Sequence, residues 1–218
     1  EAKAAAGRTE ATGLALLAFL GAGQTHKDGV HKQEVRAGFS FLIKHIEVKH
    51  RTADFRGPRG DMTSHAVAAW ALCDGYALTH DKQLLAPAQL AVNFIVEKQD
   101  KESGGWHADP MTKPSVEVTG WQLQALRSAH MAYLQVPVGT IKGGKRFLGE
   151  VQLEQGRAFP GANGRRDHRA TAIGLYSRML LGTKSSDPIL KDGLADLSRA
   201  GPQKHDALAN YFAHRLQH

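Results

Sequence analysis

Histidine and carboxylate side chains stand at or just before the starts of several strongly apolar segments, where helix N-termini are expected. Grouped together, such side chains could bind zinc or another divalent cation, because imidazole nitrogens and carboxylate oxygens are common ligands of these ions. We call these residues, together with one threonine at an equivalent position, the mouth cluster. Its members are Asp61, His65, Glu117, Thr119, Asp167, His168 and His214. A second interpretation stays open, because Asp, Thr and His are also common as helix caps and in solvated loops.

Three arginines accompany the mouth cluster in the segment Arg165-Arg166-Asp167-His168-Arg169. The N-terminus of a helix attracts anions through its exposed N–H groups and its dipole. Arg165, Arg166 and Arg169 are therefore the candidate residues for binding an anion such as a diphosphate. No cofactor is predicted, although a divalent metal at the mouth cluster stays open as an alternative.

Other sequence motifs of known chemistry are absent from the chain. The single cysteine excludes a disulfide framework and a cysteine-based zinc cluster. The sequence contains no phosphate-binding Gly-x4-Gly-Lys-Ser/Thr, no His-Glu-x2-His and no Gly-x-Ser-x-Gly. These motifs are those of common enzyme classes, so the sequence does not indicate any of these classes.

The chain has 218 residues, 42% of them apolar, and a formal net charge of +7. This length allows one sizeable core or two small ones. The charge permits anionic partners, but the basic residues are scattered and lack interleaved aromatics, so nucleic acid is not the expected partner. No apolar run reaches the ~18 residues of a spanning helix, so we expect no transmembrane segment. We expect a soluble protein of the cytoplasm or cell envelope, which could belong to a longer chain.

The elements that must position these residues recur about every 53 residues. One series consists of apolar segments that begin at Thr12, His65, Thr119 and Thr171. A second series runs in phase with the first through Phe41, Phe94, Phe147 and Leu197. Each repeat therefore holds two elements.

Both elements of the repeat are predicted to be helices. Segments of the first series, such as Leu14 to Leu20 and Ala66 to Ala71, are apolar nearly all round, which predicts buried helices. Segments of the second series have apolar residues at helical spacing opposite a charged face, which predicts amphipathic helices. Thr140 and Asp187 are predicted N-caps, and Pro87 is predicted to lie in a first turn.

Helix pairs that cannot cover their own apolar faces must stack against their neighbours. Such a stack predicts a closed or nearly closed ring, with first-series helices as the inner wall and second-series helices as the outer wall. The N-termini of the inner helices then meet at one opening. The mouth cluster is expected to converge there.

Two joints between helices carry a glutamine followed by glycine and an aromatic residue. Gln99 precedes Gly104-Gly105-Trp106, and Gln152 precedes Gly156 and Phe159. On these motifs, in phase with the repeat, the chain resembles the prenyltransferase and squalene-oxidase repeat family of terpenoid cyclases and protein prenyltransferase β subunits. The segments Thr12-Gly-Leu-Ala-Leu and Ser103-Gly-Gly-Trp106 resemble its planctomycete-type bacterial branch, which comes without an assigned reaction.

The resemblance implies an all-α fold, an α/α-toroid of about four and a half helical hairpins, where a complete toroid of the family has about six. It implies a single toroid domain over residues 9–218, preceded by a flexible segment, residues 1–8. Gln99, Trp106, Gln152 and Phe159 would form a structural brace at the joints. The sequence lacks the Asp-x-Asp-Asp acid of the cyclases and the Asp, Cys and His zinc set of the prenyltransferases, so we lean towards a protein that is not an enzyme.

Two hypotheses of function follow. The first is a binding or interaction module whose partner is a protein or an apolar small molecule, and whose open ring would favour self-association through an exposed apolar flank. The second is a binding protein or enzyme for an isoprenoid- or diphosphate-bearing ligand, which would use the mouth cluster and the three arginines.

Overall fold

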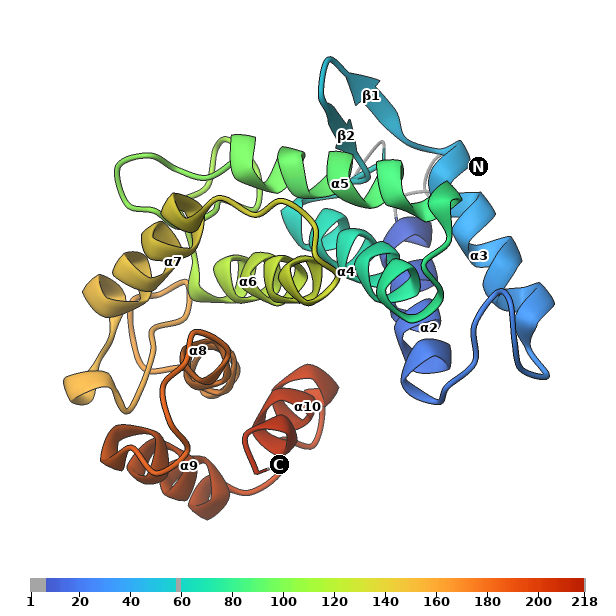
Figure 1. Cartoon of the computed structure of the whole chain (residues 1–218). Coiled ribbons are helices and arrows are strands. Elements are labelled where there is room, and N and C mark those ends of the chain that lie inside the picture. Colours follow the sequence, from blue (N-terminus) through green and yellow to red (C-terminus); the bar gives the residue numbers. More distant parts are fainter. Residues whose placement is uncertain (1–6, 58–59, 218) are drawn as a thin grey trace. The chain divides into compact units, whose positions relative to one another are not determined.

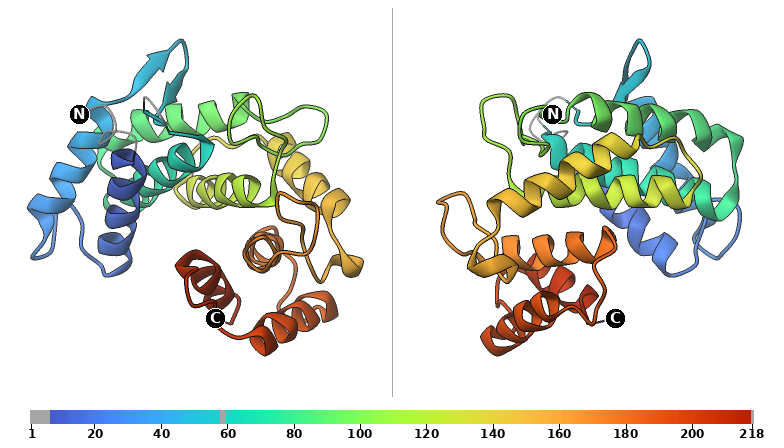
Figure 2. Two further views of the ribbon diagram at one scale, coloured as in Figure 1. Left: turned by 180° about the vertical axis from the view of Figure 1, so that it is seen from behind. Right: turned by 60° about the vertical axis from the view of Figure 1, so that its left-hand side comes forward.

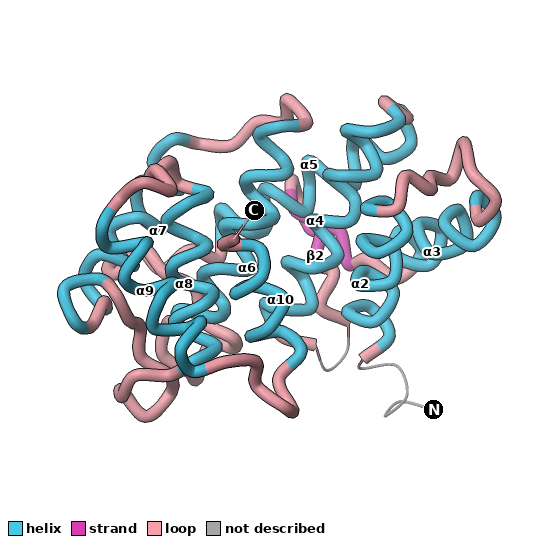
Figure 3. Tube along the Cα trace, turned by 90° about the horizontal axis from the view of Figure 1, so that it is seen from below, coloured by secondary structure: helices cyan, strands magenta, loops and turns pink. Residues whose placement is uncertain are grey.

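The computed structural model of the chain describes residues 7–57 and 60–217. Within them the protein is built of α-helices and one short two-stranded sheet (Figures 1 and 3), so the prediction of an all-α fold is confirmed. The elements, in chain order, are α2 (Arg8–Gly21), α3 (Lys32–Lys44), β1 (Glu47–Lys49), β2 (Thr52–Asp54), α4 (Met62–Thr79), α5 (Lys82–Glu97), α6 (Val116–Met131), α7 (Val138–Val151), the 3-10 turn η1 (Glu154–Gly156), α8 (His168–Leu180), α9 (Pro188–Ala200) and α10 (Ala207–Arg215).

The chain forms two compact units. Unit 1 comprises residues 1–98 and 124–137, and unit 2 comprises residues 99–123 and 138–218. The chain passes from one unit to the other within α6, so this helix contributes its first half to unit 2 and its second half to unit 1. Of the expected N-terminal segment 1–8, residues 1–6 lie outside the described part, and Arg8 begins α2.

In unit 1, α2 packs along α4, α3 packs against α2, and α5 packs against α4 (Figure 1). The antiparallel hairpin of β1 and β2 pairs Val48 with Ala53, and β2 lies against α5. This hairpin follows α3, at the place in the first repeat where the glutamine of the later joints is missing. Phe55, which comes directly after β2, is 1% exposed and supplies the buried aromatic side chain of this joint.

The prediction that α2 is buried all round is wrong. Its buried residues lie on one side only and are Thr9, Gly13, Leu16 and Leu20. Leu14 is 38% exposed, and Ala11, Ala15 and Ala18 are exposed as well. The helix α4, by contrast, is buried throughout Ala66–Ala69, because α2 and α5 both pack against it. The second half of α6 adds a hydrogen bond from Ser128 to Asp74 of α4. Only α3 and α4 pack extensively on α2 among the described elements, so its remaining side faces solvent.

In unit 2, α8 is the central helix and contacts α7, α9 and α10 (Figure 2). Its residues from Ala170 to Ser177 are all buried. The last helix, α10, packs against α8 and α9, and η1 lies against α9. The residues from Ala209 to His214, which follow the four paired units of the repeat, thus belong to a helix.

One packing contact recurs between successive first-series helices. In unit 1, a Cβ added to Gly13 of α2 would lie 2.8 Å from Val67 Cγ1 on α4. In unit 2, a Cβ added to Gly120 of α6 would overlap Ile173 Cγ2 on α8. Both glycines follow a threonine at the start of the repeat. The repeat in the sequence therefore corresponds to a repeat of close helix packing.

Aspartate side chains cap most of the described helix N-termini. Each accepts hydrogen bonds from backbone N–H groups of the first turn; the caps are Asp61, Asp81, Asp167, Asp187 and Asp206. The prediction for Asp187 is confirmed. Those for Thr140 and Pro87 are wrong, because α7 already begins at Val138, and Pro87 lies inside α5, which begins at Lys82. No helix of the described part is long and apolar enough to cross a membrane.

Candidate functional site

In unit 1, Asp61 and His65 both have structural contacts. The Asp61 carboxylate caps α4 and accepts hydrogen bonds from the N–H groups of Thr63 and Ser64. His65 is fully buried, and its Nδ1 accepts a hydrogen bond of 3.1 Å from the backbone N–H of Phe55. The ring proton must therefore lie on Nε2, which donates to the carbonyl oxygen of Ala91 at 3.1 Å.

The His65 ring is also enclosed by aromatic side chains. Its centroid lies 4.6 Å from that of Phe94 and 5.9 Å from that of Phe55. Burial lowers the pKa of His65 to about 4, although its hydrogen bond to Ala91 opposes this shift. His65 is therefore a neutral, fully hydrogen-bonded core residue at neutral pH, and both ring nitrogens are occupied.

In unit 2, Thr119 holds the position that His65 holds in the repeat, and it makes the same contact. Its Oγ1 accepts a hydrogen bond of 3.1 Å from the N–H of Trp106. Thr171 repeats the contact once more, with its Oγ1 3.1 Å from the N–H of Phe159. Both hydroxyls are fully buried. Their hydrogen bonds connect the preceding loop to the start of the helix.

The last helix carries a fourth version of this contact. Asn210, four residues after the cap Asp206, accepts a hydrogen bond of 2.7 Å from the N–H of Gln203 and donates one of 2.9 Å to its carbonyl oxygen. We call these four contacts the loop bracket: a side-chain acceptor in the first turn or turn and a half of the helix binds a backbone N–H of the loop before it. The bracket pairs are Phe55/His65, Trp106/Thr119, Phe159/Thr171 and Gln203/Asn210.

Glutamine side chains also bind at the joints. The Gln99 Nε2 donates to the carbonyl oxygens of Gly104 and Thr140, at 2.8 Å and 2.9 Å. In the following repeat, the Gln152 Oε1 accepts a hydrogen bond from Arg178 instead. Trp106 and Phe159, the aromatic residues of these joints, are fully buried.

The arginines proposed for anion binding face carboxylates of the chain itself. Arg166 lies 2.8 Å from Glu154 and 3.4 Å from Asp196. Arg169 lies 2.7 Å from Asp206 and 3.8 Å from Glu117. Arg165 is exposed. An external anion would thus compete with acidic side chains at two of the three arginines.

Carboxylates around Arg169 differ in how the protein shifts their pKa values. Burial raises the pKa of Glu117, which Arg169 opposes. Burial acts in the same direction on Asp206, but hydrogen bonds from the Ala209 N–H and from Arg169 outweigh it and lower the pKa of Asp206. Asp206 is therefore the better partner of Arg169. The third carboxylate nearby, Asp167, caps α8 by accepting the N–H of Ala170.

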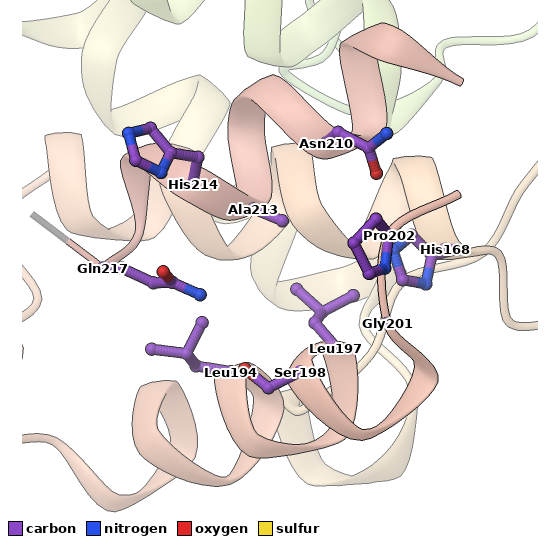
Figure 4. A pocket seen from close by; sticks show the side chains of 10 residues that line it. All are labelled: His168, Leu194, Leu197, Ser198, Gly201, Pro202, Asn210, Ala213, His214 and Gln217. Atoms are coloured by element: carbon purple, nitrogen blue, oxygen red, sulfur yellow. The ribbon is translucent and has the colours of Figure 1, made fainter. Parts of the chain in front are cut away.

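His168 and His214 line one pocket of unit 2, which Figure 4 shows. It has a volume of about 300 Å³ and lies between the start of α8, the second half of α9 and α10. Leu194 and Leu197 of α9 form its apolar wall. In Figure 4, His214 lies with Gln217 at one end and His168 with Pro202 at the other. His214 belongs to the last turn of α10, so its predicted place near a helix start is wrong.

This pocket combines apolar contact with fixed polar groups. The Asn210 amide in its wall is held by both hydrogen bonds to Gln203. His168 and His214 add one imidazole at each end of the pocket. In the described residues no three His, Cys, Asp or Glu side chains lie close enough to hold a metal ion together. The geometry therefore suits a small ligand with an apolar part and hydrogen-bonding groups at both ends.

Four residues of the bracket and the pocket were not predicted from the sequence: Thr171, Asn210, Leu194 and Gln217. A signal for the first two exists, because each stands four residues after the aspartate that caps its helix, as His65 stands after Asp61. Leu194 and Gln217 give no such signal. They meet at the pocket only through the fold of α9 and α10.

Comparison with known proteins gives no relative for this chain. No family model, no curated protein and no solved structure matches it. The assignment of a family and of a function therefore depends on the residues and the geometry described above.

Proposed function

We propose that the chain is an α/α-toroid repeat domain of the prenyltransferase and squalene-oxidase type that acts as a binding module. Two recurring features support the assignment to a repeat fold, the glycine contact between first-series helices and the loop bracket, and the hydrogen bonds of Gln99 at its joint support it as well. The proposed function is the capture of a small ligand, with no reaction at the mouth cluster. In that cluster His65 and Thr119 are buried and fasten loops, and Asp61 and Asp167 cap helices.

The pocket lined by His168 and His214 is the observation that carries this proposal. It offers two leucine side chains for an apolar group and polar side chains at both ends. A volume of about 300 Å³ lies at the lower limit of the ~300–1,000 Å³ typical of small-molecule sites. The ligand we propose is accordingly a small molecule that is partly apolar and forms hydrogen bonds with imidazole.

Native mass spectrometry with elemental analysis of the purified chain is the first test. A retained small molecule should be lost from the His168→Ala and His214→Ala variants but kept by His205→Ala, because His205 is an exposed histidine of the same unit outside the pocket. If the chain is bare, fragments of the proposed class should shift the imidazole resonances of His168 and His214 in an NMR screen. Fragments that bind without moving either resonance would contradict the proposal.

A second candidate function, self-association, rests on the exposed side of α2. Leu14 stands in the repeat where Val67 and Ile173 stand, and those two side chains each pack against a glycine of the preceding first-series helix. In α2 this position is exposed and flanked by small residues, so a second copy could pack its own α2 against it around a two-fold axis. The occupant we propose for this face is a second copy of the chain.

Sedimentation velocity tests the self-association. The native chain should form dimers at ~100 µM, and Leu14→Glu should be monomeric because the charge would be buried in the contact. Leu85→Glu is the matched control, since Leu85 is 40% exposed on α5 and lies outside this face. A monomeric native chain, or a Leu14→Glu variant that still dimerises, would exclude this function.

A further inference from the structure

Arg178 on α8 is a cation that the fold holds half-buried. Its Nη1 donates to the carbonyl oxygen of Gly156 at 3.3 Å, and its Nη2 donates to Gln152 Oε1. The guanidinium also lies 5.3 Å from the centroid of the Phe159 ring, within the range of a cation–π contact. Three separate groups therefore fix the position of this side chain.

The backbone at Gly156 makes room for the guanidinium. Gly156 has φ +97°, and a Cβ at this position would lie 2.5 Å from Arg178 Nη1 and 2.8 Å from Gln152 Oε1. An L-residue here would be strained and would also displace the arginine. The position of Arg178 is thus built into the contact between η1 and α8.

No carboxylate of the described residues lies within ion-pair distance of Arg178. Burial lowers its pKa, and only the more distant charge of Asp187 opposes this effect. A half-buried cation without a close counter-ion has an unfavourable free energy that an anionic ligand would reduce. A guanidinium has five N–H donors in total. The neutral oxygens of Gly156 and Gln152 use only part of them, so donors remain for a ligand.

A pocket of about 210 Å³ opens beside this guanidinium, within unit 2. Besides Arg178, it is lined by a second cation, a hydroxyl group and three apolar side chains: Lys145, Thr183, Leu148, Leu181 and Ile189. Asp187 is the acidic residue of the wall, and its Oδ1 accepts the N–H of Ile189 as the cap of α9. The pocket therefore pairs two cations with an apolar surface.

We infer that this pocket binds the carboxylate of a small molecule that carries a short apolar chain. The carboxylate would lie against the Arg178 fork, whose geometry suits two parallel hydrogen bonds, with Lys145 and the Thr183 hydroxyl beside it. The apolar chain would lie on Leu148, Leu181 and Ile189. This site is separate from the pocket of His168 and His214, and its failure or success leaves that proposal untouched.

Titration with sodium hexanoate, followed by ¹⁵N NMR at constant ionic strength, is the direct test. Hexanoate should shift the Arg178 side-chain resonance and the amides of Leu181 and Thr183 with a Kd of ~1 mM. 1-Hexanol, which has the same chain without the charge, should bind at least ~10-fold more weakly. N-Acetyl-leucine represents the C-terminus of a peptide, whereas hexanoate represents a free small acid. Comparing the Kd values of the two ligands therefore distinguishes the source of the carboxylate.

Variants of the residues that line this pocket distinguish a specific site from nonspecific attraction by the net charge of the protein. Lys145→Gln should weaken hexanoate ~2- to 5-fold, whereas Lys142→Gln, which removes the same charge from the same helix outside this pocket, should leave the Kd unchanged. Asp187→Asn keeps a good cap and should tighten binding ~2-fold, because it removes the one acidic group of the wall. Arg178→Lys should weaken binding ~10-fold, because lysine lacks the bidentate fork.

Three results of these titrations would overturn the inference. Shifts that grow linearly to ~50 mM hexanoate without saturation would show that no site exists. Equal affinity for hexanol and hexanoate would show that only apolar contact is involved. If Lys145→Gln and Lys142→Gln behave alike, the attraction is a property of the net charge and not of this pocket. These readings do not depend on Arg178→Lys, should that variant fail to fold.

Discussion

Replacing Thr171 with Val tests whether the loop bracket stabilises the fold. Valine has nearly the shape of threonine, so the substitution removes the hydroxyl and little else. In the native chain this hydroxyl is fully buried and accepts the N–H of Phe159 at 3.1 Å. Without it the buried N–H loses its acceptor, which costs ~1–3 kcal/mol, the penalty of an unsatisfied buried donor. The free energy of unfolding should fall by that amount.

The control for this prediction lies on the same helix. Ser177 is also buried, but its Oγ donates to the carbonyl oxygen of Ile173, which the helix itself already binds. Ser177→Ala should therefore change the free energy of unfolding by less than ~0.5 kcal/mol. Both substitutions remove one buried hydroxyl group from α8, and they differ in the group that this hydroxyl binds.

Hydrogen exchange of the Phe159 amide is the most direct measurement, because it reports the affected group itself. Exchange should be ~5- to 150-fold faster in Thr171→Val, which is the equilibrium factor for 1–3 kcal/mol. Urea unfolding of both variants gives the change in overall stability. Unchanged exchange at Phe159, with a loss of stability no larger than that of Ser177→Ala, would refute the idea that the bracket is a stabilising contact.

Trp106→Ala should lower the free energy of unfolding by ~3–5 kcal/mol in urea, because this fully buried side chain leaves a cavity; a loss below ~1 kcal/mol would contradict its place in the core. His65 has its pKa lowered to about 4, so the unfolded chain takes up the proton first as the pH falls. Stability should therefore decrease between pH ~6.5 and ~4, by up to ~1.4 kcal/mol per pH unit, and His65→Asn should reduce this slope. Gly120→Ala should cost ~1–3 kcal/mol, and Ile173→Ala in the same chain should offset part of that cost, whereas Gly139→Ala should be neutral or stabilising, because nothing lies within 4 Å of an added Cβ there.

The helical repeat could be predicted from the sequence because its signal is local. Apolar spacing and a period of about 53 residues need no knowledge of the neighbours, and they gave the order of the helices from α2 to α10. The β1–β2 hairpin was missed because its strands have only three residues each, too few for an alternating pattern to stand out. The exposure of Leu14 was missed as well, because burial depends on which helices lie alongside and not on the segment itself.

The candidate site was predictable only in part, for a related reason. Helix starts can be located in a sequence, which led to His65, Thr119 and His168. Whether a polar side chain there faces a pocket or binds a loop depends on the path of that loop. The backbone N–H of Phe55 reaches His65 from ten residues away, and no pattern of side chains encodes that approach. Arg178 was overlooked for the same reason, because it lies in the last turn of α8 and its surroundings come from α7, η1 and α9.

The loop bracket also has a consequence for how the chain folds. The four brackets join residues that are only 10, 13, 12 and 7 positions apart in the sequence. A loop of about ten residues closes in ~10–100 ns, far faster than distant helices can find one another. Each of these four helix starts therefore has its own rapid closure step, which depends on no other repeat. Folding can begin at any of the four, in either unit, and a substitution at one bracket should slow only the route that starts there.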